Sequence, residues 1–286
     1  MKINNSLLAT IPVLLCAVIA TTGCSSSMKI SLDVPERFSE QATRHHVEGA
    51  KGSGFTGAKS NLRFAGYYAD DVKRGWTFSK SVIDKTGFSE AMEQTVLINF
   101  GIEKNKITSS QNDKYQFTLK DDKGSAFVFC QEQTTSSSTR ISTRYTGEIN
   151  TMKGQRYNFA ATIFPTDINP SAGWMLELGY DLNTPGGMLA TVIRDGLPVE
   201  KGFITNKADT ITVKPVYVKR TKNYETGKAG NFPITLLGGY EFRIGEGVAA
   251  IVDVINDNIW FYNGLGRDYK IVIAAAASAI LLRRER

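Results

Sequence analysis

The sequence is poor in the residues that build disulfide frameworks and metal centres. Its 286 residues include only three cysteines, two histidines and three tryptophans. It contains no C-x-x-C, no H-E-x-x-H and no spaced cluster of histidine with aspartate, which are common signatures of metal and redox sites. We therefore expect neither a metal ion nor another cofactor.

Long hydrophobic runs are also scarce. The chain has two extended apolar stretches, residues 7–20 and residues 271–282. A helix that spans a bilayer needs about 20 apolar residues, so both stretches are too short. The first one also contains Pro12. A permanent transmembrane anchor is therefore the poorer interpretation of either stretch.

The first 24 residues have the pattern of an export signal. Lys2 precedes the apolar stretch, and small residues follow it, as in a signal peptide. The sequence Ala20-Thr21-Thr22-Gly23-Cys24 resembles the lipobox of bacterial lipoproteins, in which small residues precede the cysteine that begins the mature chain. This family usually has Leu where Thr21 stands. The other nearby cysteine, Cys16, follows the bulky Leu15 and is interpreted as an apolar filler.

The resemblance to bacterial lipoproteins implies a location and a partner. It implies that residues 1–23 are removed, that Cys24 receives palmitate or similar acyl chains, and that residues 24–34 form a lipidated N-terminus and short tether. Two or three acyl chains make a membrane anchor stable. Ser25, rather than Asp, follows the lipid site. In a Gram-negative cell envelope this implies the outer membrane, facing the periplasm. An ordinary secretory signal is the alternative.

The charge pattern gives little support to nucleic acid binding. The 263 residues after residue 23 have a net charge of +5, with basic residues spread along the chain. One local group is denser and includes two tyrosines: Lys214, Tyr217, Lys219, Arg220, Lys222, Tyr224 and Lys228. We interpret it as a basic hairpin, which either contacts anionic lipid headgroups or is a solvated loop.

Alternating hydrophobicity predicts an α+β fold made mainly of antiparallel β-sheet. The alternation appears at residues 115–119, 127–129, 157–163, 174–180 and 240–244, and the first two of these segments form a hairpin. Apolar residues at helical spacing predict an amphipathic helix near 88–102. A second helix is predicted near 268–285, with Asp268 at its start and arginines at its end, as the helix dipole favours. We expect this helix to pack on the sheet, because its apolar run lacks the polar face of a membrane-lying helix.

These elements predict a single β-rich domain over residues 35–286. The polar stretch at residues 131–139 is interpreted as a loop and is the alternative place for an internal boundary. If Cys24 is lipidated, Cys130 is the one thiol left, so no disulfide forms within the mature chain. Cys130 shares a predicted strand face with Ala126 and Val128, which favours a buried, unreactive thiol.

Two motifs are weak candidates for chemistry. Residues 52–57 fit G-x-G-x-x-G, but an extended segment follows them where a phosphate-binding loop would open a helix. We therefore interpret them as a flexible loop. His45 and His46 are adjacent, so in a strand they would point to opposite faces and not form a metal site together.

Carboxylates and aromatic residues supply the candidates for glycan chemistry. Glycoside hydrolysis needs two carboxylates a few ångströms apart, and the candidates are Asp70, Asp71, Glu177, Asp181 and Asp195. The candidates for stacking on sugars are Trp76, Trp174, Trp260, Tyr67 and Tyr68, although Trp174 shares its strand face with core residues. Because no pairing is visible, the favoured hypothesis is a non-catalytic binding or structural module of the cell envelope, with a protein or glycan partner. The alternative is an envelope hydrolase acting on glycan, peptide or ester.

Overall fold

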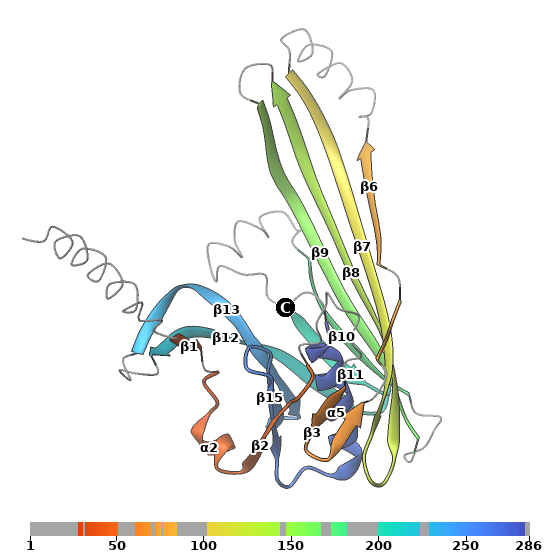
Figure 1. The fold of residues 1–286 in the computed structure, drawn as a ribbon, viewed down its shortest axis with the longest axis vertical. Coiled ribbons are helices and arrows are strands. Elements are labelled where there is room, and N and C mark those ends of the chain that lie inside the picture. Colours follow the sequence, from red (N-terminus) through yellow and green to blue (C-terminus); the bar gives the residue numbers. More distant parts are fainter. Residues whose placement is uncertain are drawn as a thin grey trace, which may run out of the picture. The chain divides into compact units, whose positions relative to one another are not determined.

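The protein is a mostly antiparallel β-sheet with two helices in the residues that the structure describes (Figure 1). This computed structural model describes residues 28–30, 32–50, 61–69, 72–75, 77–84, 102–143, 147–166, 173–181, 200–223 and 229–283. The helices are α2 (Glu36–Ser39) and α5 (Arg267–Leu281). The expected α+β class with mainly antiparallel strands is confirmed.

Fifteen strands of the described residues belong to one sheet. In chain order they are β1 (Met28–Ile30), β2 (Ala42–His46), β3 (Leu62–Phe64), β4 (Tyr67–Ala69), β5 (Lys73–Arg74), β6 (Phe78–Asp84), β7 (Ile102–Lys120), β8 (Ser125–Thr143), β9 (Gly147–Pro165), β10 (Trp174–Asp181), β11 (Lys201–Thr205), β12 (Thr210–Asn223), β13 (Ala229–Ile244), β14 (Gly247–Asp253) and β15 (Asn258–Tyr262). Their spatial order is β2-β15-β14-β13-β12-β11-β10-β9-β8-β7-β4-β3, with β5 and β6 also on β7 and β1 on β12.

The chain divides into two compact units. The larger unit comprises residues 32–219 and 233–286, and the smaller comprises residues 1–31 and 220–232. In the smaller unit, β1 pairs with the far end of β12. In the larger unit, Leu32 is already buried, so the folded part begins before the predicted start at residue 35.

The sheet of the larger unit is nearly closed and barrel-like. Its end strands are β2 and β3, and Glu48, just after β2, forms a bridge with Arg63 of β3. Gly49 follows at a φ of +75°, and a Cβ there would lie 1.9 Å from the carbonyl oxygen of Asn61. Only glycine combines this left-handed backbone with so close an approach. The closing point of the sheet therefore depends on Gly49.

The predicted strands are confirmed, and their apolar faces are buried except on β8, where Phe127 and Phe129 point outward and Ala126, Val128 and Cys130 face the core. Lys120 pairs with Ser125 at the end of the β7–β8 hairpin, where the Asp121 carboxylate accepts bonds from the backbone N–H of Lys123 and Gly124. The buried residues alternate along the strands, as one covered face requires. They include Tyr115, Phe117, Leu119, Val128, Cys130, Tyr157, Phe159, Ile163, Trp174, Leu176, Leu178, Tyr240 and Phe242.

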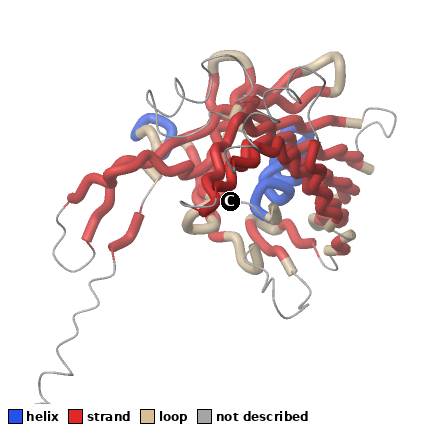
Figure 2. Tube along the Cα trace, turned by 90° about the horizontal axis from the view of Figure 1, so that it is seen from above, coloured by secondary structure: helices blue, strands red, loops and turns tan. Residues whose placement is uncertain are grey.

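The predicted C-terminal helix is α5, and strands lie around it (Figure 2). Residues 271–282 are all buried, so the helix is covered on every side rather than on one face. Its ring and backbone contacts reach β10, β15 and β7: Tyr269 meets Trp174, Lys270 meets Phe261, and Tyr115 donates to Ala279 O at 2.5 Å. A helix that is apolar all round is a buried one. The helix ends at Leu281, earlier than the predicted residue 285.

Strands β7, β8 and β9 continue past the other strands as a sheet with β6 (Figure 1). Residues 131–139 lie inside β8 and pair with β7 and β9, so the interpretation of this stretch as a polar loop is wrong. The stretch pairs through backbone hydrogen bonds even though serine and threonine dominate it. The helix predicted near 88–102 lies outside the described residues, except that residue 102 begins β7.

Candidate functional site

A cluster of polar side chains lies inside the larger unit, around Arg283 beyond the end of α5. Arg283 Nη1 donates to Tyr157 Oη at 3.0 Å and to Glu200 Oε2 at 3.2 Å, and Nη2 donates to Tyr240 Oη at 2.5 Å. Tyr240 donates to Glu200, and Tyr157 donates to Glu132 Oε1 at 2.7 Å. We call these five residues the Arg283 cluster. It brings together α5, β8, β9, β13 and the residue before β11.

All five residues of the Arg283 cluster are buried, with exposed fractions of 8% or less for the whole residue. Burial raises the pKa of Tyr157 and of Tyr240 well above the usual tyrosine value, although Arg283 opposes this shift. Burial also disfavours the charged form of Arg283, but Tyr240, Tyr157 and Glu200 outweigh it and raise the pKa of Arg283. Both tyrosines therefore stay neutral, and the guanidinium stays charged beside Glu200.

Three aromatic rings pack around the guanidinium of Arg283. The guanidinium carbon lies 5.8 Å from the ring centre of Tyr157, 5.3 Å from that of Phe159 and 5.2 Å from that of Tyr240. Arg74 donates to Leu282 O at 2.8 Å, so a second cation stands at the C-terminal end of α5. Cations there are favoured by the helix dipole. These contacts tie the C-terminal end of α5 to the surrounding strands.

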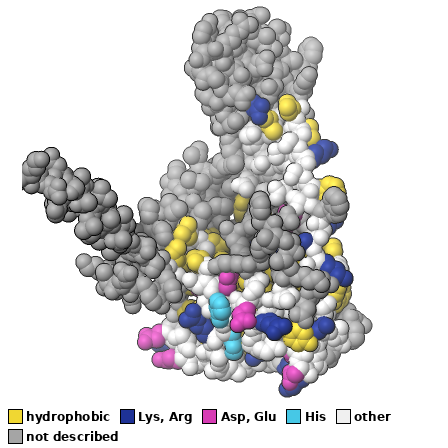
Figure 3. Space-filling model, viewed as in Figure 1, with side chains coloured by type: hydrophobic (Ala, Val, Ile, Leu, Met, Phe, Trp, Pro, Cys, Tyr) yellow, Lys and Arg dark blue, Asp and Glu magenta, His cyan; other side chains and the backbone are white. Residues whose placement is uncertain are grey.

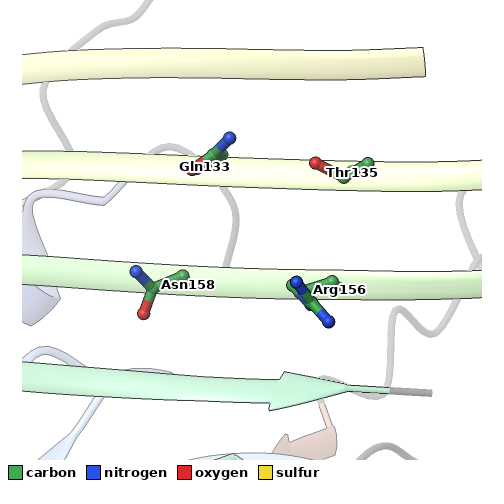
Figure 4. Close-up of a pocket in the computed structure, with 4 residues that line it drawn as sticks. All are labelled: Gln133, Thr135, Arg156 and Asn158. Carbon is green, nitrogen blue, oxygen red and sulfur yellow. The ribbon is translucent and has the colours of Figure 1, made fainter. Parts of the chain in front are cut away.

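The outward face of β8 and β9 carries a different group of polar side chains. Gln133 and Thr135 on β8 and Arg156 and Asn158 on β9 line an open hollow of about 280 Å³ (Figure 4). The register places Gln133 opposite Asn158 and Thr135 opposite Arg156. We call these four residues the outer polar site. Amide, hydroxyl and guanidinium groups supply both donors and acceptors of hydrogen bonds.

Exposed apolar side chains continue the same outward face. Because alternate residues of a strand share a face, Phe129 and Phe127 lie on this face beyond Gln131 of β8, and Phe164 lies beyond Ala160 and Thr162 of β9. Met175 of β10 and Phe203 of β11 also point outward. These five side chains are between 38% and 43% exposed. The face thus joins hydrogen-bonding groups to a row of partly exposed apolar surfaces.

The histidines lie on opposite faces of β2, as predicted. His45 pairs with Ile259 and its ring packs against Phe261 at 6.2 Å, and burial together with the charge of Lys270 lowers the pKa of His45. His46 lies outside, with Nδ1 at 3.4 Å from Asn258 Oδ1. It lines an open hollow of about 500 Å³ together with Glu48, Arg63, Tyr68 and the β3–β4 turn. Figure 3 shows both histidines at the surface beside acidic and basic side chains.

Of the five candidate carboxylates, Glu177 is the one whose side chain lies in the described part of the structure. Glu177 stands on the outward face of β10, where its register partners are Ala160 and Phe203. Asp181 ends β10, and Asp70, Asp71 and Asp195 lie outside the described residues. Within the part of the chain that is described, no group of three or more His, Cys, Asp and Glu residues is placed to hold a metal ion.

The other candidates divide between core and surface. Trp174 and Tyr67 are buried core residues, Trp260 has Arg44 at 5.3 Å over its ring, and Tyr68 is 37% exposed. Trp76 lies outside the described residues, as do residues 52–57, Cys24, Tyr224 and Lys228. Tyr217, Lys219, Arg220 and Lys222 are in β12, as is the exposed Lys214.

Cys130 is confirmed as a buried free cysteine. Burial raises the pKa of its thiol well above the usual value, which keeps it protonated and unreactive. The sequence analysis missed the Arg283 cluster and the outer polar site. Gln133 and Thr135 lie in the stretch interpreted as a loop, which is polar at every position, so no hydrophobic alternation marked it as a strand.

The chain matches no protein-family model, no curated protein and no solved structure. Over the described residues, every helix is too short or too polar to cross a membrane.

Proposed function

We propose that this chain is a lipid-anchored protein of the cell envelope whose outward sheet face binds a glycan without cleaving it. The anchor is Cys24, at the end of the lipobox-like sequence, and residues 1–23 are the export signal. The observation that carries the binding function is that the outer polar site and several exposed aromatic residues lie on the same outward sheet face. A glycan offers hydroxyl groups and apolar C–H faces, which match these two kinds of surface.

The composition of the outward face favours binding over hydrolysis. Ligand sites commonly join apolar side chains to a few polar groups that fix the orientation of the ligand. Glycoside hydrolysis needs a second carboxylate near the first. Beside the outer polar site, Glu177 has Ala160 and Phe203 as its register partners, so neither neighbouring strand offers it a carboxylate partner there. The envelope hydrolase hypothesis is therefore the weaker one.

The proposal is tested by co-sedimentation of the protein with purified peptidoglycan sacculi and with other insoluble envelope polysaccharides. The double variant Gln133→Ala and Asn158→Ala removes two amides from the outer polar site. At about 0.5–1.5 kcal/mol for each hydrogen bond, we expect binding to weaken on the order of tenfold.

The matched control removes two other exposed amides, Gln41→Ala and Asn61→Ala, and we expect wild-type binding from it. The proposal is wrong if the wild type sediments with none of the polysaccharides, or if both double variants bind like the wild type. Release of soluble sugar fragments during incubation would show hydrolysis and contradict the non-catalytic part of the proposal.

A further inference from the structure

The start of the described chain is tied to the basic hairpin in the smaller unit. Strand β1 pairs with the far end of β12 in antiparallel register, with Met28 opposite Asn223, Lys29 opposite Lys222 and Ile30 opposite Thr221. The hairpin predicted from the sequence is therefore joined, by backbone pairing, to the segment that follows Cys24. The sequence alone gave no sign of this pairing.

The length of chain between the anchor and this pairing is short. Cys24 precedes Met28 by four residues. Four residues in fully extended conformation span at most about 14 Å. When Cys24 is inserted in a bilayer through its acyl chains, Met28 at the start of β1 is held within that distance of the headgroups, and the rest of β1 and its partners at the end of β12 follow within a few residues. The electrostatic attraction of an anionic surface acts over about one Debye length, roughly 8 Å at physiological salt.

The smaller unit is also rich in positive charge. The paired segments, residues 28–30 and 220–223, contain three basic residues, Lys29, Arg220 and Lys222, and no acidic residue. The register sets Lys29 opposite Lys222, so the basic positions of the two strands are neighbours in the ladder.

We propose that β1 and the adjoining end of β12 form a second membrane contact, which binds the headgroups of anionic phospholipids. The proposal rests on the proposed lipid anchor at Cys24, which holds the basic residues at the membrane surface. A basic residue near an anionic surface contributes about 1 kcal/mol to membrane binding, so several basic residues together strengthen the binding substantially. The lipid charge, rather than the lipid chains, is what this contact recognises.

The test is flotation with vesicles of phosphatidylcholine that contain phosphatidylglycerol, compared with vesicles of phosphatidylcholine alone. A chain that starts at Ser25 keeps every described strand and helix and has no acyl chains, so we expect it to fold and to report the headgroup contact alone. We expect it to float with the anionic vesicles, less at high salt, and not with the neutral ones. The triple variant Lys29→Gln, Arg220→Gln and Lys222→Gln should bind on the order of 100-fold more weakly.

The matched control neutralises three exposed lysines of the larger unit, Lys114→Gln, Lys120→Gln and Lys123→Gln. Equal binding to both vesicle types, or an equal loss in the control, overturns the proposal. If the triple variant has an altered thermal melt, the single variants Lys29→Gln and Lys222→Gln replace it, each with an expected loss of about fivefold. Incorporation of labelled fatty acid by the full chain reports on the Cys24 anchor separately, so failure of the anchor is distinguishable from failure of the headgroup contact.

Discussion

Arg283 and Arg156 illustrate two uses of the same side chain. Arg283 is buried inside the sheet, beside Glu200 and the rings of Tyr157 and Tyr240. Arg156 is exposed on the outward face of β9, on the outer polar site. Removing the partner of a buried charge is strongly destabilising, whereas an exposed charge contributes little to stability. We therefore expect the Arg283 cluster to stabilise the fold, and we place the proposed binding function on the outer polar site.

The largest effect on stability is expected from removing helix α5, which the strands of the sheet surround. A chain that stops before Ile271 loses twelve consecutive buried residues, and each large apolar side chain among them contributes about 1.5–3 kcal/mol on burial. We expect insoluble or degraded protein, measured by soluble yield and thermal melting. A control that stops after Arg283 keeps the Arg283 cluster and should melt like the full chain. Normal yield from the shorter chain would show that α5 is dispensable.

A smaller but still large effect is expected for Arg283→Met. The variant keeps an apolar stem of similar length but leaves Glu200 buried without its cation. Removing one partner of a buried ion pair costs about 3–5 kcal/mol. Unfolding in urea should show this loss of stability. The double variant Arg283→Met and Glu200→Gln should recover part of it, because no unpaired charge then remains. If Arg283→Met is as stable as the wild type, Arg283 does not stabilise the fold and the contrast with Arg156 is wrong.

The smallest effect on stability is expected when the same arginine-to-methionine change is made on the outward face of β9. Arg156→Met alters an exposed side chain, and surface substitutions usually change stability by less than about 0.5 kcal/mol. The same urea titration should therefore place its midpoint close to that of the wild type. If Arg156→Met is as destabilising as Arg283→Met, Arg156 is a structural residue and the outer polar site loses its strongest donor.

The sequence predicted the parts of the fold in which one face is apolar and the other polar. The strands through Tyr157 and Trp174 alternate clearly, and the apolar run of α5 lacks a polar face because strands surround it. The stretch at residues 131–139 misled the prediction because its side chains are polar on both faces of β8. Such a strand is stabilised by its pairing with β7 and β9, and the local sequence pattern does not show this pairing.

The candidate sites were less predictable for a similar reason. The arginines at the chain end fit the helix dipole, but the partner of Arg283 is Glu200, which is distant in sequence and not in a recognisable motif. The register of β8 and β9, which brings Gln133 beside Asn158, follows from the long hairpin rather than from either residue. By contrast, the lipobox-like sequence at Cys24 is local, so it can be read without the fold.

Both proposals start from the lipid anchor, and labelling with radioactive palmitate tests that anchor most directly. Cys24→Ala removes the thiol that accepts the lipid, so we predict that the variant incorporates no label and appears as uncleaved precursor or as soluble exported protein. Cys16→Ala is the matched control and should be labelled like the parent chain, because Leu15 does not suit the small residue expected before a lipidated cysteine. If Cys24→Ala still takes up labelled palmitate and fractionates with membranes as the parent does, Cys24 is not the anchor.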